Sequence, residues 1–251
     1  MDLGLSGRVY LVTGGSKGLG FATAAALVAD GARVVTSSRD PENVRAAVAR
    51  LGGEGKAAGA AADLADPEAP ERLAALALET FGRLDGALIS VGGPPPGTAA
   101  AATDAQWRAA FESVFLGTVR AARTVAGRLT DGGAIGMVLS SSARSPVTGL
   151  GISNGLRPGL AMVAKDMADE FGPRGVRVFG LLPGRIATDR LVELDAAAGP
   201  EARENALRTI PLGRYGQPEE FGRTAAFLLS PAASYVTGTV LPVDGGASRT
   251  P

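Results

Sequence analysis

Short apolar runs alternate along the chain with longer segments in which apolar and polar residues follow a helical period. Such runs predict β-strands, and the longer periodic segments predict helices. We expect strands at Arg8–Thr13, Arg33–Ser37, Lys56–Ala62, Asp85–Val91, Ala134–Ser140, Val176–Leu182 and Thr239–Val243. We expect helices from Gly20 to Asp30, over Pro41–Leu51, Asp66–Phe81, Asp104–Leu129 and Ser153–Phe171, and from Pro218 onward.

The regular alternation of strands and helices indicates βαβ units, and near-continuous apolar strands are typical of a parallel sheet that is buried on both faces. The pattern therefore predicts an α/β fold in which a doubly wound, parallel, seven-stranded sheet carries helices on both faces. No Pro- or Ser-rich linker interrupts the pattern, so we expect residues 1–251 to form a single domain.

Composition excludes several function classes. The 25 Lys and Arg residues equal the 25 Asp and Glu residues, so no basic excess is available to hold a nucleic acid. Cysteine and histidine are absent, which excludes disulfides, a cysteine nucleophile and a Ser-His-Asp triad, and we expect no metal. Residues Met1–Gly7 lack the features of a signal peptide, and no apolar run approaches 18 residues. We therefore expect no membrane association and a cytoplasmic location.

A glycine-rich segment, Thr13–Gly20, follows the first strand and opens the first helix. Its glycines permit a tight turn and close backbone approach, and the helix N-terminus offers free N–H groups to a pyrophosphate. The alternative is a glycine-rich turn between strand and helix that binds nothing.

The same segment resembles the TGxxxGxG fingerprint of the short-chain dehydrogenases/reductases, in particular of 3-oxoacyl-carrier-protein-reductase-like members. Further segments resemble the family's motifs in the family's order: Asp63-Leu64, Pro183–Thr188 (PGxxxT), Gly213–Glu220, Val236–Gly238 and Val243–Gly246. The resemblance covers nearly the whole chain and implies a Rossmann fold that binds a nicotinamide cofactor. It assigns cofactor contacts to Gly14, Ser16, Lys17, Gly18, Leu19, Gly20, Ser38, Arg39, Asp63, Leu64, Val91, Gly92, Arg157, Pro183, Gly184, Ile186 and Thr188.

Two cations indicate which nicotinamide cofactor is bound. An acidic residue after the second strand would bind the ribose 2′-hydroxyl of NAD, but this chain has Ser38 and Arg39 there, with Lys17 in the glycine loop. Guanidinium and ammonium groups suit a 2′-phosphate, so we expect NADP(H). The alternative is that Lys17 and Arg39 are solvated surface residues.

The catalytic positions depart from the family pattern of a serine, a tyrosine thirteen residues later and a lysine four beyond it. Counting along the chain places Ser140, Ser153 and Arg157 at these positions, and Phe115 at the family's asparagine. A serine hydroxyl is far less acidic than a phenol, and Arg157 stays protonated and cannot transfer a proton. Loss of a general acid typically costs ~10²–10⁴ in rate.

Ser153 has a second interpretation, because a serine at the start of a helix often caps it, with Pro158 in or near the first turn. Ser153 and Arg157 share a helix face if the helix covers both. Under the family resemblance, Arg157 holds the nicotinamide ribose and Ser140 polarises the substrate oxygen. Ser141 and Ser142 read as strand-end and loop hydroxyls.

The resulting expectation is an NADP(H)-dependent reductase acting on a small or carrier-linked carbonyl-type, imine or enone substrate. Two alternatives remain: a catalytically silent NADP(H)-binding sensor or partner subunit, and a non-redox lyase or isomerase on the same scaffold. The resemblance also implies a substrate lid at residues 188–217 and a homotetramer, which the apolar content of the helix at 104–129 supports.

Overall fold

The computed structural model describes residues 2–129, 132–199 and 201–249. Within these ranges, seven strands form one sheet in the order β3-β2-β1-β4-β5-β6-β7, and every neighbouring pair is parallel. The strands are β1 (Val9–Val12), β2 (Arg33–Ser38), β3 (Ala57–Ala61), β4 (Gly86–Ile89), β5 (Gly133–Val138), β6 (Val176–Pro183) and β7 (Val240–Val243). The predicted doubly wound parallel sheet is confirmed.

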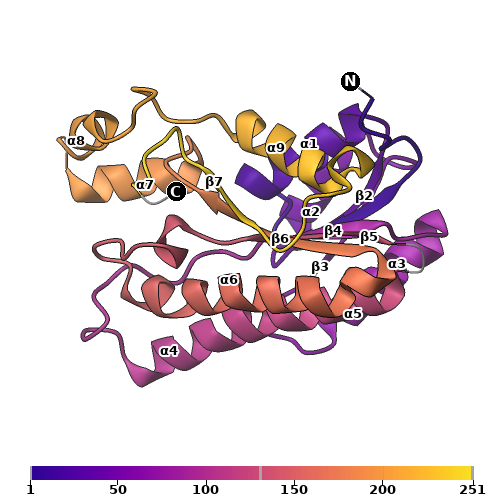
Figure 1. Cartoon of the computed structure of the whole chain (residues 1–251), viewed down its shortest axis with the longest axis horizontal. Helices are drawn as coiled ribbons and strands as arrows, with labels where there is room; N and C mark the ends of the chain where they lie inside the picture. The colour runs from indigo at the N-terminus through magenta and orange to yellow at the C-terminus, as the bar shows by residue number, and fades with distance from the viewer. Residues whose placement is uncertain (1, 130–131, 200, 250–251) are drawn as a thin grey trace.

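Helices cover both faces of the sheet. They are α1 (Gly18–Ala29), α2 (Pro41–Arg50), α3 (Ala69–Phe81), α4 (Asp104–Ala110), α5 (Gly117–Arg128), α6 (Gly151–Phe171), α7 (Asp189–Ala198), α8 (Ala202–Arg208) and α9 (Pro218–Leu229). Helices α1 and α9 lie on one face, and α5 and α6 lie on the other (Figure 1). Each face encloses its own apolar core, so the strands are buried on both sides.

The helix expected at 104–129 is present, but its middle is wound differently. Residues Phe111–Leu116 form a π-helical section between α4 and α5. The hydroxyl of Ser113 donates to the Ala109 carbonyl at 2.8 Å, and that of Thr118 donates to the Val114 carbonyl at 2.6 Å. Hydroxyls that bond back to carbonyls one turn earlier compete with the backbone ladder and bend a helix, which fits the local change of winding.

Helix α6 begins at Gly151, two residues before the predicted start, with Leu150 as the N-cap residue. The early start follows from pairing with the loop after β4: the Gly97 N–H donates to the Gly149 carbonyl at 2.7 Å, and the Gly151 N–H donates to the Gly97 carbonyl at 2.8 Å. The N-cap interpretation of Ser153 is therefore wrong. Pro158 also lies inside the helix and not in its first turn.

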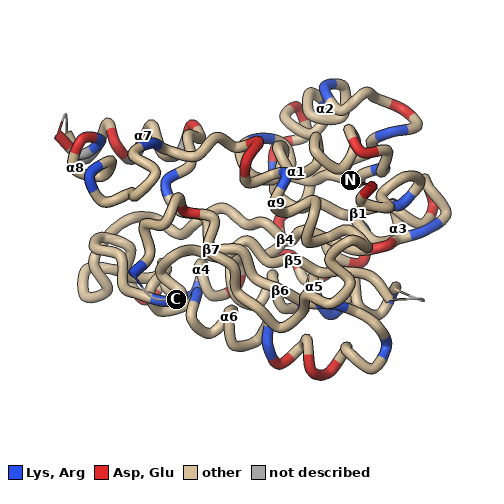
Figure 2. The backbone as a smooth tube through the Cα atoms, turned by 45° about the horizontal axis from the view of Figure 1, so that its top comes forward, with Lys and Arg blue, Asp and Glu red and all other residues tan. Residues whose placement is uncertain are grey.

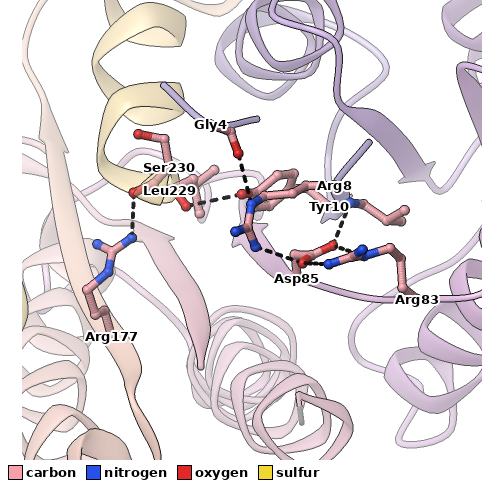
Figure 3. A network of polar contacts seen from close by, with 9 residues as sticks. Gly4, Arg8, Tyr10, Arg83, Asp85, Arg177, Leu229 and Ser230 are labelled. Atoms are coloured by element: carbon pink, nitrogen blue, oxygen red, sulfur yellow. Dashed lines mark hydrogen bonds and ion pairs between the residues drawn. The ribbon is translucent and has the colours of Figure 1, made fainter. Parts of the chain in front are cut away.

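A polar network ties the amino ends of the central strands together, at the sheet edge opposite the glycine loop (Figure 3). Asp85 accepts from Arg8 at 2.9 Å, from two atoms of Arg83 at 2.6 and 2.8 Å, and from the Val9 N–H at 2.9 Å. Burial alone raises the pKa of Asp85, but these hydrogen bonds and the two guanidinium charges hold it below its usual range. The network fixes where β1 and β4 begin.

Charged residues of both signs are spread over the helices and connecting segments, while the central strands carry few (Figure 2). None of the helices in the described part of the chain is long and apolar enough to cross a membrane.

Candidate cofactor and active site

The glycine loop sits at the carboxyl ends of β1, β2 and β4. Thr13 joins two of them, because its hydroxyl donates to the Ser90 carbonyl and accepts from the Ser90 N–H, both at 2.9 Å. The Gly15 N–H donates to the Ser37 carbonyl at 3.0 Å, which adds β2. The loop is therefore held by the sheet before any ligand binds.

The glycines of this loop are required by close approach and by backbone conformation. A Cβ on Gly14 would lie 2.6 Å from the Ser90 carbonyl oxygen, and one on Gly20 would lie 2.4 Å from the Gly14 carbonyl oxygen. Gly14 and Gly18 have φ values of 58° and 57°, which other residues rarely adopt. The loop is thus compact enough to bring the start of α1 against the sheet, as a pyrophosphate cradle requires.

The N-terminus of α1 is open to a ligand. Lys17 is the N-cap residue in extended conformation, and its side chain makes no capping hydrogen bond. The first N–H groups of a helix have no partner inside the helix and carry partial positive charge. Ser16 and Leu19, the other predicted contacts in this loop, are half-buried.

Lys17 and Arg39 are both exposed, and no ion pair of either is found within the described residues. Ser38 donates to the Asp40 carbonyl at 3.1 Å. The nearest carboxylate, Asp40, caps α2 by accepting from the Glu42 N–H at 2.8 Å and from the Asn43 side chain at 2.7 Å. This carboxylate is engaged in the cap, so the end of β2 presents the exposed guanidinium of Arg39, while Lys17 lies in the glycine loop after β1.

The remaining predicted cofactor residues surround the same edge of the sheet. Asp63 is exposed and accepts from the Ala65 N–H at 2.9 Å, while Leu64 is buried. Val91 is half-buried and Gly92 is exposed, and a Cβ on Gly92 would meet nothing within 4 Å. The structure thus leaves room beside Gly92 for a bound group.

The segment Pro183–Thr188 continues from β6 over the glycine loop. The Gly184 N–H donates to the Val243 carbonyl at 3.0 Å. Gly184 also packs against Asp244, because a Cβ added to Gly184 would lie only 2.5 Å from the Cβ of Asp244. Ile186 is buried, and the Thr188 methyl would lie 3.6 Å from a Cβ on Gly18. The two predicted cofactor motifs therefore face each other across the carboxyl edge, which is the arrangement that a dinucleotide needs.

Ser140 follows β5 and begins a short 3₁₀ turn, Ser141–Ala143. It is half-buried, and its hydroxyl accepts from the Ser142 N–H at 3.2 Å. A serine hydroxyl has one proton and two acceptor sites. This bond uses an acceptor site, so the proton of Ser140 remains available to a substrate oxygen.

Ser153, at the position of the family's tyrosine, does not bond Ser140. It is only 6% exposed, and its hydroxyl lies 3.0 Å from the hydroxyl of Ser142, which is itself 3% exposed. Sequence reasoning missed Ser142 as the partner, because three consecutive serines give no signal of which one faces the helix.

Arg157, at the position of the family's lysine, is 3% exposed, and its Nη1 donates to the Val138 carbonyl at 2.9 Å. The Leu139 N–H is hydrogen-bonded to β6. The backbone groups of successive strand residues point to opposite sides, so those of Val138 point toward β4. Because β4 already ends at Ile89, opposite Met137, the Val138 carbonyl lies beyond the ladder and accepts from the guanidinium. The assignment of Arg157 to the nicotinamide ribose stays a prediction.

Phe115, at the position of the family's asparagine, lies in the π-helical section. Its ring stacks on Phe111 with 5.2 Å between centroids, and a Cβ on Gly159 would lie 2.9 Å from it. This site therefore differs from the family pattern at the asparagine, tyrosine and lysine positions together.

The predicted lid contains α7 and α8, and its two ends are joined. The Ala187 N–H donates to the Gly216 carbonyl at 2.8 Å, and the Gly216 N–H donates to the Arg185 carbonyl at 3.0 Å. Asp195 of α7 accepts from the Tyr215 hydroxyl at 2.8 Å and from Arg185 at 2.7 Å. Burial and the bond to Asp195 raise the pKa of Tyr215.

A cavity of about 550 Å³ lies next to the joined ends of the lid, between the loops that precede α9 and follow β7. It is lined by Arg185, Arg214, Leu212, Phe221 and Asp244, among others. Arg214 is paired with Glu220 through two contacts of 2.7 Å, so the charges of this cavity are largely balanced.

Comparison with known proteins agrees with this geometry. A family model described as "Enoyl-(Acyl carrier protein) reductase" matches residues 14–248. The 2,5-dichloro-2,5-cyclohexadiene-1,4-diol dehydrogenase of Sphingobium indicum is 34% identical over 247 residues, covering 96% of this chain and 97% of that protein.

Two solved structures share the fold over almost the whole chain. L-sorbose reductase from Gluconobacter frateurii, solved with NADPH and L-sorbose, has a TM-score of 0.90 at 29% identity and covers 100% of both chains. A 7α-hydroxysteroid dehydrogenase, solved with NADH and 7-oxo glycochenodeoxycholic acid, has a TM-score of 0.91 at 28% identity and covers 99% of this chain and 97% of its own. The chain belongs to the short-chain dehydrogenase/reductase family of oxidoreductases.

Proposed function

We propose that this protein is an NADP(H)-dependent reductase whose substrate carries an acceptor that needs little help from an acid, such as an imine or an enone. The observation that carries the proposal is the contrast between the two halves of the site. The cofactor half keeps the family's loop and adds two exposed cations. The catalytic half has Ser153 turned toward Ser142 in place of a phenol directed at the substrate.

The cofactor preference rests on two cations, one in the glycine loop and one just after β2. Lys17 and Arg39 are exposed, and the carboxylate of Asp40 is committed to capping α2. A guanidinium binds a phosphate through two parallel hydrogen bonds, which a ribose hydroxyl does not match. Solved relatives include one with NADPH and one with NADH, so the residues of this chain decide the preference.

The proposed substrate class rests on the missing acid. Bound NADPH supplies a hydride. Reduction of a simple ketone builds charge on an alkoxide oxygen, which the family's tyrosine neutralises by proton transfer. Hydride addition to an iminium creates no oxyanion, and addition to an enone spreads the charge over a conjugated system. With an enone, Ser140 donates one hydrogen bond to the substrate oxygen, and water supplies the proton that completes the product. An iminium already carries its proton, so hydride addition alone gives the amine.

Two measurements test the proposal. Fluorescence titration should show that NADPH binds at least tenfold more tightly than NADH, a difference of about 1.4 kcal/mol. Arg39→Ala should remove most of this preference, whereas Arg45→Ala, which alters an exposed arginine on α2, should keep it. Equal affinity for the two cofactors, or tighter NADH binding, would contradict the proposal.

A substrate screen tests the proposed substrate class. We expect imines or enones to oxidise NADPH and simple ketones to do so at least a hundredfold more slowly, since a general acid is typically worth ~10²–10⁴ in rate. Rapid reduction of simple ketones would show that another group supplies the acid.

A silent NADP(H)-binding subunit is the second candidate, favoured by the burial of Ser153 and Arg157. Tight NADPH binding without turnover of any compound in a broad screen would favour this candidate over the reductase.

A further inference from the structure

Three side chains near the start of α6 contact one short segment of chain that runs from the last residue of β5 into the loop after it. Ser153 bonds Ser142, Asn154 bonds Val147, and Arg157 bonds the Val138 carbonyl. Two of these three positions are where the family keeps its tyrosine and lysine. In this chain, the Ser153 hydroxyl lies against a buried hydroxyl and Arg157 donates to a backbone carbonyl.

Asn154 makes the most complete of these contacts. Its Oδ1 accepts from the Val147 N–H and its Nδ2 donates to the Val147 carbonyl, both at 3.0 Å. The amide thus pairs with Val147 as a neighbouring strand would, satisfying both backbone groups of one loop residue.

The loop held in this way follows Ser140 along the chain, and its residues 144–150 are called the wall below. Val147 begins a tight turn, closed by the Leu150 N–H to the Val147 carbonyl at 3.1 Å, with Gly149 at φ 76° as a type II turn requires. Gly149 in turn accepts from the Gly97 N–H, so the loop after β4 is attached to the same wall.

We propose that Ser153, Asn154 and Arg157 form a clasp that holds residues 138–147 against α6, with Asn154 as a positioning residue for the substrate wall. The clasp presets the position of Ser140, which lies inside the held segment. The positioning of substrate rests on the proposed function, while the clasp itself does not. In the family, this face of the helix carries the catalytic side chains. In this chain, its side chains hold the loop after β5 in place.

Hydrogen exchange on the unmodified protein gives the first test. The Val147 N–H bonds only the Asn154 side chain, and the neighbouring Thr148 N–H has no hydrogen bond within the described residues. We expect Val147 to exchange at least a hundredfold more slowly than Thr148. Equal exchange of the two amides would overturn the proposal.

Limited proteolysis of a variant gives the second test. Arg144 is exposed within the held segment, so trypsin cleavage after it reports release of the loop. Asn154→Ala should speed this cleavage at least tenfold, while Asn205→Ala, at an exposed position of α8, should match the unmodified protein. An unchanged rate at Arg144, or equal acceleration at every site, would overturn the clasp.

Ligand readouts separate positioning from a general loss of structure. Asn154→Ala should keep the NADPH dissociation constant within about twofold. With an enone or imine from the screen, KM should rise at least tenfold and kcat should stay within threefold. A fall in kcat with unchanged KM would overturn the positioning role. Exchange and proteolysis need neither cofactor nor turnover, so a protein that reduces nothing contradicts the proposed function alone.

Discussion

Single side chains decide the character of this site. Ser153 occupies the position of the family's tyrosine, yet its hydroxyl lies 3.0 Å from that of Ser142 in a buried environment. A buried hydroxyl without a partner costs more than its hydrogen bond contributes, so each serine depends on the other. The pair stabilises the turn after β5 and leaves Ser140 as the half-buried hydroxyl at its edge.

A double-mutant cycle tests this dependence. Ser142→Ala and Ser153→Ala should each lower the free energy of unfolding by about 1–2 kcal/mol, since each leaves a buried hydroxyl unsatisfied. The double variant should lose about 1 kcal/mol less than the sum, because it leaves no orphan. Denaturant titration measures all four proteins, and strictly additive losses would show that the two hydroxyls do not interact.

At the scale of elements, one strand residue holds the end of a helix. Arg177 of β6 is 9% exposed and donates to the carbonyls of Leu228 at 2.7 Å, Ser230 at 2.9 Å and Val236 at 3.2 Å. The last carbonyls of a helix have no partner inside it and carry partial negative charge, which a cation satisfies. Arg177 therefore fixes α9, which packs on α1 so closely that a Cβ on Gly222 would lie 2.4 Å from the Ala22 carbonyl oxygen.

Replacing this arginine should loosen α9. Arg177→Met leaves two buried carbonyls and one partly buried carbonyl without this donor, and we expect the free energy of unfolding to fall by about 3 kcal/mol. Arg223→Met, an exposed position on the same helix, should change it by no more than about 0.5 kcal/mol. Thermal and denaturant unfolding supply the measurement, and equal losses in the two variants would contradict this role.

At the scale of the whole molecule, two buried groups at the amino ends of the central strands contribute to the dependence of stability on pH. The depressed pKa of Asp85 means that its contribution is complete above its ordinary value of about 3.9 and is lost as pH falls below it. Burial raises the pKa of Tyr10 to about 12, so stability falls as pH rises from about 10 toward that value.

Unfolding measured across pH has an acid limb, where stability falls at low pH, and an alkaline limb, where it falls at high pH. Two variants separate the two limbs. Asp85→Asn should cost about 2 kcal/mol at neutral pH and flatten the acid limb. Tyr10→Phe should flatten the alkaline limb, while Tyr235→Phe, at a fully exposed position, should leave it unchanged. An alkaline limb that persists in Tyr10→Phe would assign it to another group.

The predicted homotetramer belongs to the same scale. Phe111 is 45% exposed and Met162 is 71% exposed, which places apolar side chains on the outer faces of the π-helical section and α6. We expect sedimentation at about four times the 25.2 kDa of one chain. Phe111→Glu should yield smaller species, and Val192→Glu should not. A 25.2 kDa species alone at micromolar concentration would refute the tetramer.

The sequence by itself determined the architecture and the position of the glycine loop. Apolar strands that alternate with helices predict an α/β fold with a buried parallel sheet, and Gly14 and Gly20 lie where a Cβ would meet a backbone oxygen. The cations at Lys17 and Arg39 could also be identified from the sequence, because each follows a strand whose position the apolar pattern predicts. These features depend on local pattern and on residue type.

Only the tertiary structure decided what the altered catalytic positions contact. The start of α6 moved to Gly151 because Gly97, more than fifty residues away in sequence, pairs with the turn before it. That shift placed Ser153 inside the helix, beside Ser142, and removed its capping role. The partner of Arg157 depended on where β4 stops relative to β5. Such contacts are set by the register of segments distant in sequence, which local periodicity does not encode.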